Sequence, residues 1–102
     1  MVAVIQEHEN ELQQLCERFG VERLEVFGSA AGPDFDPESS DLDFLVQFRR
    51  SASGGAADRY FDLLEALEEL FERPVDLLED RAVRNPFFRE SIEATRQLLY
   101  AA

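Results

Sequence analysis

The segment at 41–48, "DLDFLVQF", alternates between apolar and other residues almost without a break. Successive side chains of a β-strand point to opposite faces, so this alternation predicts a strand with one face on a core. The core face holds four apolar residues: Leu42, Phe44, Val46 and Phe48. The other face begins with two carboxylates, Asp41 and Asp43, and continues with Leu45 and Gln47. A strand with paired acids opposite a buried row restricts both the fold and the chemistry of the chain.

The residues before this strand predict a helix, a strand and a loop. Apolar residues at three- and four-residue spacings predict a helix over about 2–19, with Gly20 at its expected C-terminal end. A short apolar run at 24–27 predicts a strand. The stretch at 28–40 is rich in Gly, Pro, Asp and Ser, so it predicts a loop that leads into the strand at 41–48.

A second helix and a third strand are expected after a polar connection at 49–58. Asp58 is the predicted N-cap of this helix, and an apolar stripe continues to about residue 73 with acids on the opposite side. Pro74 ends the helical pattern. The run "VDLLE" at 75–79 then predicts a short strand.

The last segment predicts a final helix. Asn85 and Pro86 occupy helix-opening positions, and an amphipathic run continues to the end of the sequence. Phe87 and Phe88 are expected to pack the start of this helix against the core. The predicted order is helix, strand, strand, helix, strand, helix, in a single domain over 1–102 without internal repeats or a linker.

Charge and apolar content limit the classes of function. The formal charge of −12 has the wrong sign for a surface that grips nucleic acid phosphates unaided, so no direct nucleic acid binding is expected, while a basic protein partner would be attracted. No apolar run approaches the roughly 20 residues that cross a bilayer, and the acidic start lacks a secretory signal, so we expect a cytoplasmic protein. Cys16 is expected to be a small buried hydrophobe and His8 a solvated surface residue.

The two acids on the central strand form the strongest candidate site. Residues i and i+2 of a strand point the same way, so Asp41 and Asp43 project together with Cα atoms roughly 6.5 Å apart. Their mutual repulsion favours a divalent cation, and Mg²⁺ is commonly held by one or two carboxylates together with substrate phosphates. Asp76 is an isolated acid in the third strand, and it would join the same patch if the two strands are neighbours. Three acids suit a two-metal phosphoryl transfer, with the third able to act as a base.

Gly28 and Ser29 supply a complementary feature. A glycine directly after a strand lets the backbone approach a phosphate closely, and a serine adds a hydroxyl and an amide donor. We therefore expect these two residues to bind the phosphates of a nucleotide opposite the metal-binding acids.

Together these motifs resemble the minimal nucleotidyltransferases of the DNA polymerase β superfamily. The resemblance rests on "FGS", on "SDLDFLV" after a loop, and on the isolated acid of "VDLLE", and it covers nearly the whole chain. It implies an α+β fold with a small mixed β-sheet of three or four strands and helices packed on one side. It assigns Gly28 and Ser29 to the nucleotide, Asp41 and Asp43 to the metals, and Asp76 to the third catalytic acid.

The same resemblance implies a function. Family members transfer a nucleoside monophosphate from an NTP, commonly ATP, to a hydroxyl with Mg²⁺. Short members are often antitoxins of HEPN-domain toxins and can adenylylate a tyrosine of the toxin. We therefore expect an antitoxin of a toxin-antitoxin system with protein adenylyltransferase activity, and a homo- or hetero-oligomer remains open.

One departure from the family pattern leaves an alternative open. The usual loop carries an arginine after Gly-Ser, whereas 28–46 contains no Lys or Arg. The missing charge could come from Arg49, Arg50, Arg81 or Arg84, or from the partner. The alternative is a catalytically degenerate antitoxin that neutralises its toxin by occlusion. A third hypothesis is transfer to a small molecule or an RNA end, for which larger family members carry an additional substrate domain.

Overall fold

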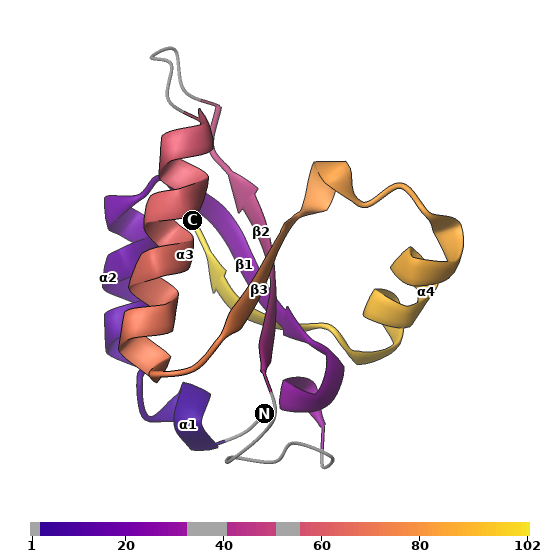
Figure 1. Cartoon of the computed structure of the whole chain (residues 1–102), viewed down its shortest axis with the longest axis horizontal. Helices are drawn as coiled ribbons and strands as arrows, with labels where there is room; N and C mark the ends of the chain where they lie inside the picture. The colour runs from indigo at the N-terminus through magenta and orange to yellow at the C-terminus, as the bar shows by residue number, and fades with distance from the viewer. Residues whose placement is uncertain (1–2, 33–40, 51–55) are drawn as a thin grey trace.

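The computed structural model describes residues 3–32, 41–50 and 56–102, and it contains one four-stranded sheet with helices on both faces (Figure 1). The strands are β1 (Val21–Phe27), β2 (Leu42–Phe48), β3 (Val75–Glu79) and β4 (Gln97–Ala101). The helices are α1 (Ala3–Gln6), α2 (Glu9–Arg18), α3 (Ala56–Phe71) and α4 (Pro86–Thr95). Two 3₁₀ turns, η1 (Gly28–Ala31) and η2 (Asp80–Ala82), follow β1 and β3.

The sheet is mixed, with the strand order β3-β2-β1-β4. β1 pairs antiparallel with both β2 and β4, whereas β2 and β3 run parallel and are joined through α3. This topology confirms the expected α+β class and places β2, which carries the paired acids, beside β3, which carries the third.

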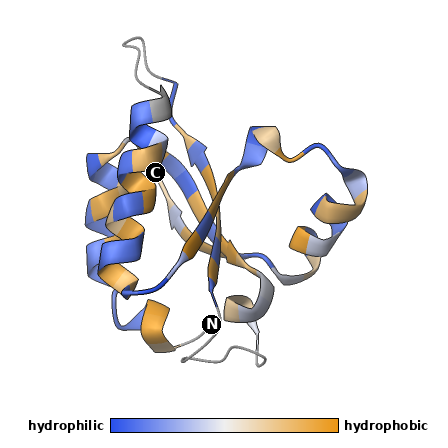
Figure 2. Cartoon of the chain, viewed as in Figure 1, coloured by the Kyte–Doolittle hydropathy of each residue, from blue (hydrophilic) through white to orange (hydrophobic). Residues whose placement is uncertain are grey.

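The helices lie in two layers. α2 and α3 cover one face of the sheet and α4 lies on the other side of it (Figure 1). α2 and α3 carry hydrophilic residues alongside hydrophobic ones, as expected for helices with one side on a core (Figure 2). The expectation of helices on one side therefore holds for α2 and α3 but not for α4, whose Ile92 packs with Phe27 and Leu45 in a second, smaller cluster.

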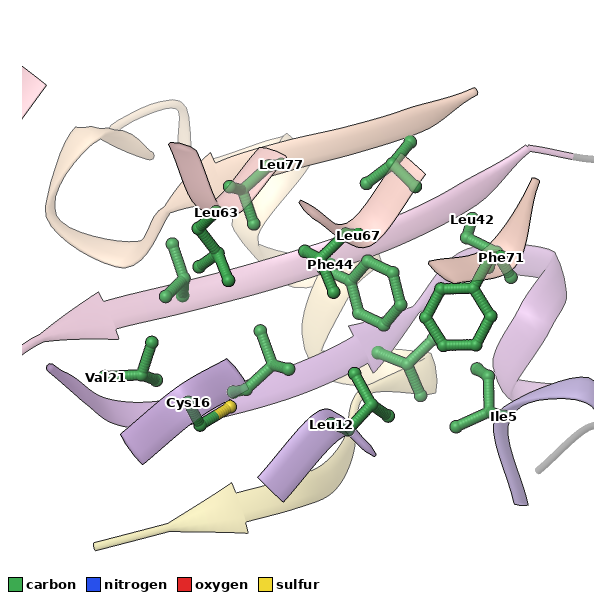
Figure 3. Close-up of a cluster of buried hydrophobic side chains, with 14 of the residues drawn as sticks. Ile5, Leu12, Cys16, Val21, Leu42, Phe44, Leu63, Leu67, Phe71 and Leu77 are labelled. Atoms are coloured by element: carbon green, nitrogen blue, oxygen red, sulfur yellow. The ribbon is translucent and has the colours of Figure 1, made fainter. Parts of the chain in front are cut away.

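The main core confirms the alternation of β2. Its four predicted core residues all lie in the cluster shared with α1, α2 and α3: Leu42, Phe44, Val46 and Phe48. The rings of Phe44 and Phe71 lie with their centroids 5.8 Å apart (Figure 3). Cys16 is fully buried there, as predicted, and burial raises the pKa of its thiol to about 12, so the side chain stays protonated and apolar.

The first helix is interrupted, which corrects the single helix expected over 2–19. The chain leaves helical geometry between α1 and α2, and His8 precedes the second helix. The imidazole Nδ1 of His8 donates a 2.8 Å hydrogen bond to the carbonyl oxygen of Val4, and its ring meets Phe71 edge-on at 5.3 Å. His8 is therefore half-buried and packed, and its expected place on a solvated surface was wrong.

The C-terminal segment differs most from expectation. The final helix begins as predicted, because the Asn85 side chain accepts hydrogen bonds from the backbone N–H groups of Phe87 at 2.9 Å and Phe88 at 3.2 Å. It ends at Thr95, however, and Arg96 turns the chain into β4, which pairs with β1. The helical spacing was wrong after Thr95 because pairing with β1 satisfies the backbone groups of both strands.

Two local expectations also need correction. α3 begins two residues before Asp58, so that acid lies in the first helical turn, where it is still favourable to the helix dipole, and is not the N-cap. Phe87 is 81% exposed and does not pack against the core, whereas Phe88 contacts Phe27 edge-on with centroids 6.3 Å apart. Within the described ranges, no helix is long and apolar enough to cross a membrane.

Candidate functional site

The register of β2 and β3 brings two of the candidate acids side by side. Asp43 and Asp76 are direct partners across the parallel pair, so their side chains leave the same face of the sheet from neighbouring strands. Asp41 lies one residue before β2 and is exposed. From the sequence, Asp76 was expected to join the other two acids if the two strands were neighbours. The structure contains this strand pairing.

The electrostatics of Asp43 reflect this crowding. Burial of the carboxyl group, its hydrogen bond with Asp76 and the negative charges of Asp76 and Asp41 raise the pKa of Asp43 from 3.8 to about 6. The Asp43 carboxylate is therefore stabilised when it binds a proton or when another cation lies beside it. The site therefore favours a positive ligand between the carboxylates.

Gly28 lies against the same carboxylate. It has a φ of 71°, in the left-handed region that favours glycine, and it opens η1 directly after the β1 residue that pairs with Asp43. A Cβ atom at this position would lie only 2.6 Å from Oδ2 of Asp43, which is closer than two such atoms can approach. Gly28 is therefore required both by its backbone conformation and by the place of the acid. Ser29 follows it and is half-buried.

The η1 turn is fastened at both ends by the segment that links α4 to β4. The backbone N–H of Gly28 donates a 2.9 Å hydrogen bond to Oγ1 of Thr95. At the other end of the turn, Nε2 of Gln97 donates a 3.2 Å hydrogen bond to the carbonyl oxygen of Ala31. Neither residue was identified from the sequence, because both fall within the run that was expected to be one continuous helix.

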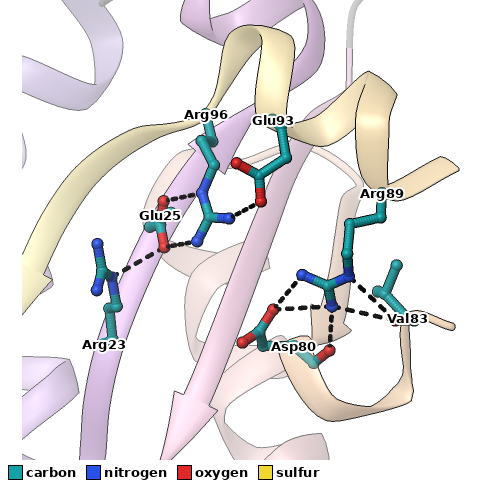
Figure 4. Close-up of polar contacts among 7 residues, drawn as sticks. All are labelled: Arg23, Glu25, Asp80, Val83, Arg89, Glu93 and Arg96. Atoms are coloured by element: carbon teal, nitrogen blue, oxygen red, sulfur yellow. Dashed lines mark hydrogen bonds and ion pairs between the residues drawn. The ribbon is translucent and has the colours of Figure 1, made fainter. Parts of the chain in front are cut away.

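A buried ion pair joins Glu25 to Arg96, the residue between Thr95 and Gln97 in the sequence (Figure 4). Glu25 of β1 is only 3% exposed, and its carboxylate accepts hydrogen bonds of 2.6 Å from Nε and 2.5 Å from Nη2 of Arg96. Arg23 adds a 2.9 Å ion pair on one side, and Glu93 binds the other end of the Arg96 guanidinium. The hydrogen bonds from Arg96 are the main cause that lowers the pKa of Glu25, so this carboxylate is charged at neutral pH. The pair holds the end of α4 on β1 and thereby positions Thr95.

The donor set of the acidic site fits a hard divalent cation. Carboxylate oxygens are the ligands that Mg²⁺ prefers, and the ion completes its shell with waters and phosphates, so two neighbouring carboxylates suffice. Among the described residues, no three His, Cys, Asp or Glu side chains are arranged as a ready-made metal cluster. Asp43 and Asp76 are consequently the pair best placed to share an ion, with Asp41 beside them.

Three of the four arginines proposed as replacements for the missing loop arginine lie elsewhere. Arg49 and Arg50 follow the C-terminal end of β2, whereas Asp43 lies near its beginning. Six residues of extended chain separate Asp43 from Arg49, which corresponds to roughly 20 Å. Arg81 belongs to η2, after β3, and lines the same cavity as Arg49 and Arg50. None of these three residues is positioned by its strand to neutralise a phosphate at Gly28.

Comparison with known proteins gives one consistent result. A family described as "Nucleotidyltransferase domain" matches residues 8–99. Two curated relatives from Methanocaldococcus jannaschii, each named "Putative protein adenylyltransferase", are 32% and 34% identical over 79 residues. The match covers 78% of this chain in both cases and 77% and 76% of the relatives.

Solved structures agree with this result. One described as a "putative minimal nucleotidyltransferase" is 31% identical with a TM-score of 0.72, and the match covers 91% of this chain and 90% of that one. Two more distant chains share the fold. A chain of the structure described as "tri-AMPylated Shewanella oneidensis HEPN toxin in complex with MNT antitoxin" is 17% identical with a TM-score of 0.64, and the match covers 95% of this chain and 72% of that one. A chain of the structure described as "toxin-antitoxin with AMP-PNP" is 18% identical with a TM-score of 0.66, and the match covers 92% of this chain and 73% of that one.

Proposed function

The chain belongs to the nucleotidyltransferase domain family, and from this premise we propose that it is a Mg²⁺-dependent enzyme that transfers AMP from ATP to a protein hydroxyl. The observation that carries the proposal is the pairing of Asp43 with Asp76 across β2 and β3, directly beside the Gly28 backbone. In this proposal, residues 1–102 act as one domain. The reaction takes place in the cytoplasm, where ATP is available.

The residues of the site have distinct roles in the proposed reaction. Asp41, Asp43 and Asp76 would hold Mg²⁺, and the bound ion would offset the charge of the ATP phosphates. Asp76 would accept the proton of the attacking hydroxyl as its oxygen bonds to the α-phosphorus of ATP and pyrophosphate leaves. Gly28 would let the backbone approach the phosphates closely, and Ser29 would contact them through its amide and hydroxyl.

We propose a tyrosine of a cognate HEPN toxin as the acceptor. Two structural neighbours are described as toxin-antitoxin complexes, and the toxin of one of them is tri-AMPylated. The formal charge of −12 also favours encounter with a basic protein. The chain would then act as an antitoxin that silences its toxin by covalent modification.

The direct test is transfer of label from α-³²P-ATP to the cognate HEPN protein in the presence of Mg²⁺. The wild type is expected to label the partner, and Asp43→Asn to reduce the rate by about 100-fold or more because it removes a metal-binding carboxylate. Asp62→Asn is the matched control, since it removes the same charge from an exposed position on α3. Equal rates for the wild type and Asp43→Asn would exclude this site as the catalytic centre.

A second candidate is neutralisation by occlusion, with an inactive nucleotide site. One observation favours it: 28–46 contains no Lys or Arg. Full neutralisation of the toxin by Asp43→Asn, with no label transferred by the wild type, would establish this candidate in place of the first.

A further inference from the structure

A second polar cavity lies at the opposite end of the sheet from the three acids. Its volume is about 470 Å³, and six polar or charged residues line it: Gln47, Arg49, Arg50, Arg59, Glu79 and Arg81. Four guanidinium groups thus surround one cavity in a chain whose formal charge is −12. This concentration of positive charge is not used by the proposed transfer reaction, because the cavity and Asp43 lie at opposite ends of β2.

Several of these arginines have no acidic partner in the part of the chain that the structure describes. Arg23, Arg89 and Arg96 each form an ion pair with a glutamate or an aspartate. Arg49, Arg50 and Arg81 form no ion pair with any described residue, and all three side chains are exposed. Within the described ranges, no ion pair therefore occupies the donors of these three side chains.

Arg59 is held in place beside them. One of its five N–H donors is used in a 3.3 Å hydrogen bond from Nη1 to the carbonyl oxygen of Arg49. Its guanidinium carbon lies 5.1 Å from the centre of the Phe48 ring. The Arg49 backbone is fixed in turn, because its N–H donates a 2.8 Å hydrogen bond to the carbonyl oxygen of Gly20. At least one guanidinium is therefore ordered before any ligand arrives.

The position in the fold also suits an anion. The cavity lies beyond the carboxyl ends of the parallel strands β2 and β3, which is where ligands bind in open α/β sheets. Arg59 belongs to the first turn of α3, whose N-terminal end carries a partial positive charge. The helix dipole and the guanidinium groups therefore both favour negative charge at this end of the cavity.

We propose that this cavity binds a small phosphorylated molecule that carries two or more phosphate groups, at a site separate from the one that carries out transfer. Guanidinium groups bind phosphate oxygens in a bidentate manner. Several guanidinium groups together therefore suit a ligand with several phosphates better than a ligand with a single carboxylate. Gln47 and Glu79 add acceptors for a hydroxyl or amine of the same ligand.

The test is titration of the full chain with inorganic tripolyphosphate in Mg²⁺-free buffer, followed by calorimetry and by backbone NMR. Binding is expected, with shifts confined to 46–50, Arg59 and 79–81. The double variant Arg49→Gln/Arg81→Gln is expected to weaken binding by about 100-fold, with about tenfold lost for each charge-assisted contact. Arg84→Gln is the matched control, because Arg84 is exposed and does not line the cavity.

Four outcomes would overturn the proposal. They are the absence of tripolyphosphate binding by the wild type, unchanged affinity in Arg49→Gln/Arg81→Gln, an equal loss in Arg84→Gln, and NMR shifts confined to Gly28–Ala31. Citrate binding as tightly as tripolyphosphate would likewise overturn the assignment to phosphates. All of the exchanged side chains are exposed, so the variants are expected to melt at the wild-type temperature, which separates loss of binding from loss of folding.

Discussion

The backbone amide of Gly28 donates its hydrogen bond to the hydroxyl oxygen of Thr95, which lies 67 positions later in the chain. The next-but-one residue, Gln97, holds the other end of the same turn through Ala31. Between them, Arg96 binds Glu25. Three consecutive residues therefore fix the geometry of the turn that is proposed to bind the phosphates, although none of them belongs to the nucleotidyltransferase motifs of the sequence.

Thr95→Val is expected to weaken ATP binding while keeping the fold. The exchange conserves shape and removes the acceptor for the Gly28 amide, at a cost of about 1 kcal/mol in the free energy of unfolding. Urea denaturation measures the stability, and calorimetric titration of Mg²⁺-ATP measures the affinity. Thr95→Ser retains the hydroxyl and is expected to behave like the wild type. ATP binding by Thr95→Val at or above wild-type affinity would contradict the positioning role.

Gly28→Ala is expected to be strongly destabilising and to abolish nucleotide binding. The new Cβ would occupy a left-handed backbone conformation and lie 2.6 Å from Oδ2 of Asp43. We expect a loss of roughly 1–3 kcal/mol in the free energy of unfolding. Gly32→Ala is the matched control, because a Cβ at Gly32 would meet nothing within 4 Å and its φ of −137° is extended. Thermal unfolding of the two variants should therefore give clearly different midpoints, and equal midpoints would refute this account.

Asp43→Asn is expected to stabilise the fold at neutral pH and to do so less in acid. The folded-state pKa of Asp43 is raised to about 6, so between pH 4 and pH 6 the folded state binds more protons than the unfolded one. The free energy of unfolding of the wild type therefore falls as pH rises through this range. Asparagine does not titrate, so the Asp43→Asn variant lacks this decrease. Urea denaturation at pH 4.5 and pH 7.5 measures the difference between variant and wild type. A stabilisation that is larger at pH 4.5 would show that the sign is wrong.

Arg96→Met is expected to destabilise the protein by about 3 kcal/mol, because it leaves the carboxylate of Glu25 buried with Arg23 as its remaining cation. Arg84→Met, at an exposed position, is expected to change stability by less than about 0.5 kcal/mol. Chemical denaturation at pH 7 measures both. The double variant Glu25→Gln/Arg96→Met should recover part of the loss, and a double variant no more stable than Arg96→Met would contradict the role of the buried charge.

The ion pair also has a pH dependence opposite to that of Asp43. The folded-state pKa of Glu25 is lowered, so its contribution to stability is present above the unfolded pKa of about 4.5 and is lost as pH falls through the lowered value. The wild type and Arg96→Met should therefore converge in stability in strong acid.

The residues whose environment is set locally could be predicted from the sequence. The period of two in β2 identified both the buried row and the acids, because burial on one face follows from the pleat. Asp76 could be placed beside Asp43 once the strands were assumed to be neighbours. The capping role of Asn85 followed from its place before Pro86.

The residues whose environment depends on distant pairing could not be predicted. Residues 97–101 have a spacing that suits a helix, and only β1 turns them into a strand. His8 was placed on the surface because the packing of its ring on Phe71 joins segments more than sixty residues apart. Thr95 and the pair of Glu25 with Arg96 have no sequence signal for the same reason.

The late position of Arg96 in the chain has a consequence for biosynthesis. Glu25 leaves the ribosome 71 residues before its main partner, which corresponds to roughly 4–14 s at about 5–20 residues per second. During that time its carboxylate has to stay hydrated, and the edge of β1 that will receive β4 has no strand beside it. The nascent protein therefore completes its sheet only after translation has passed residue 101, and until then β1 presents an unpaired sheet edge, the kind of edge with which other chains can pair.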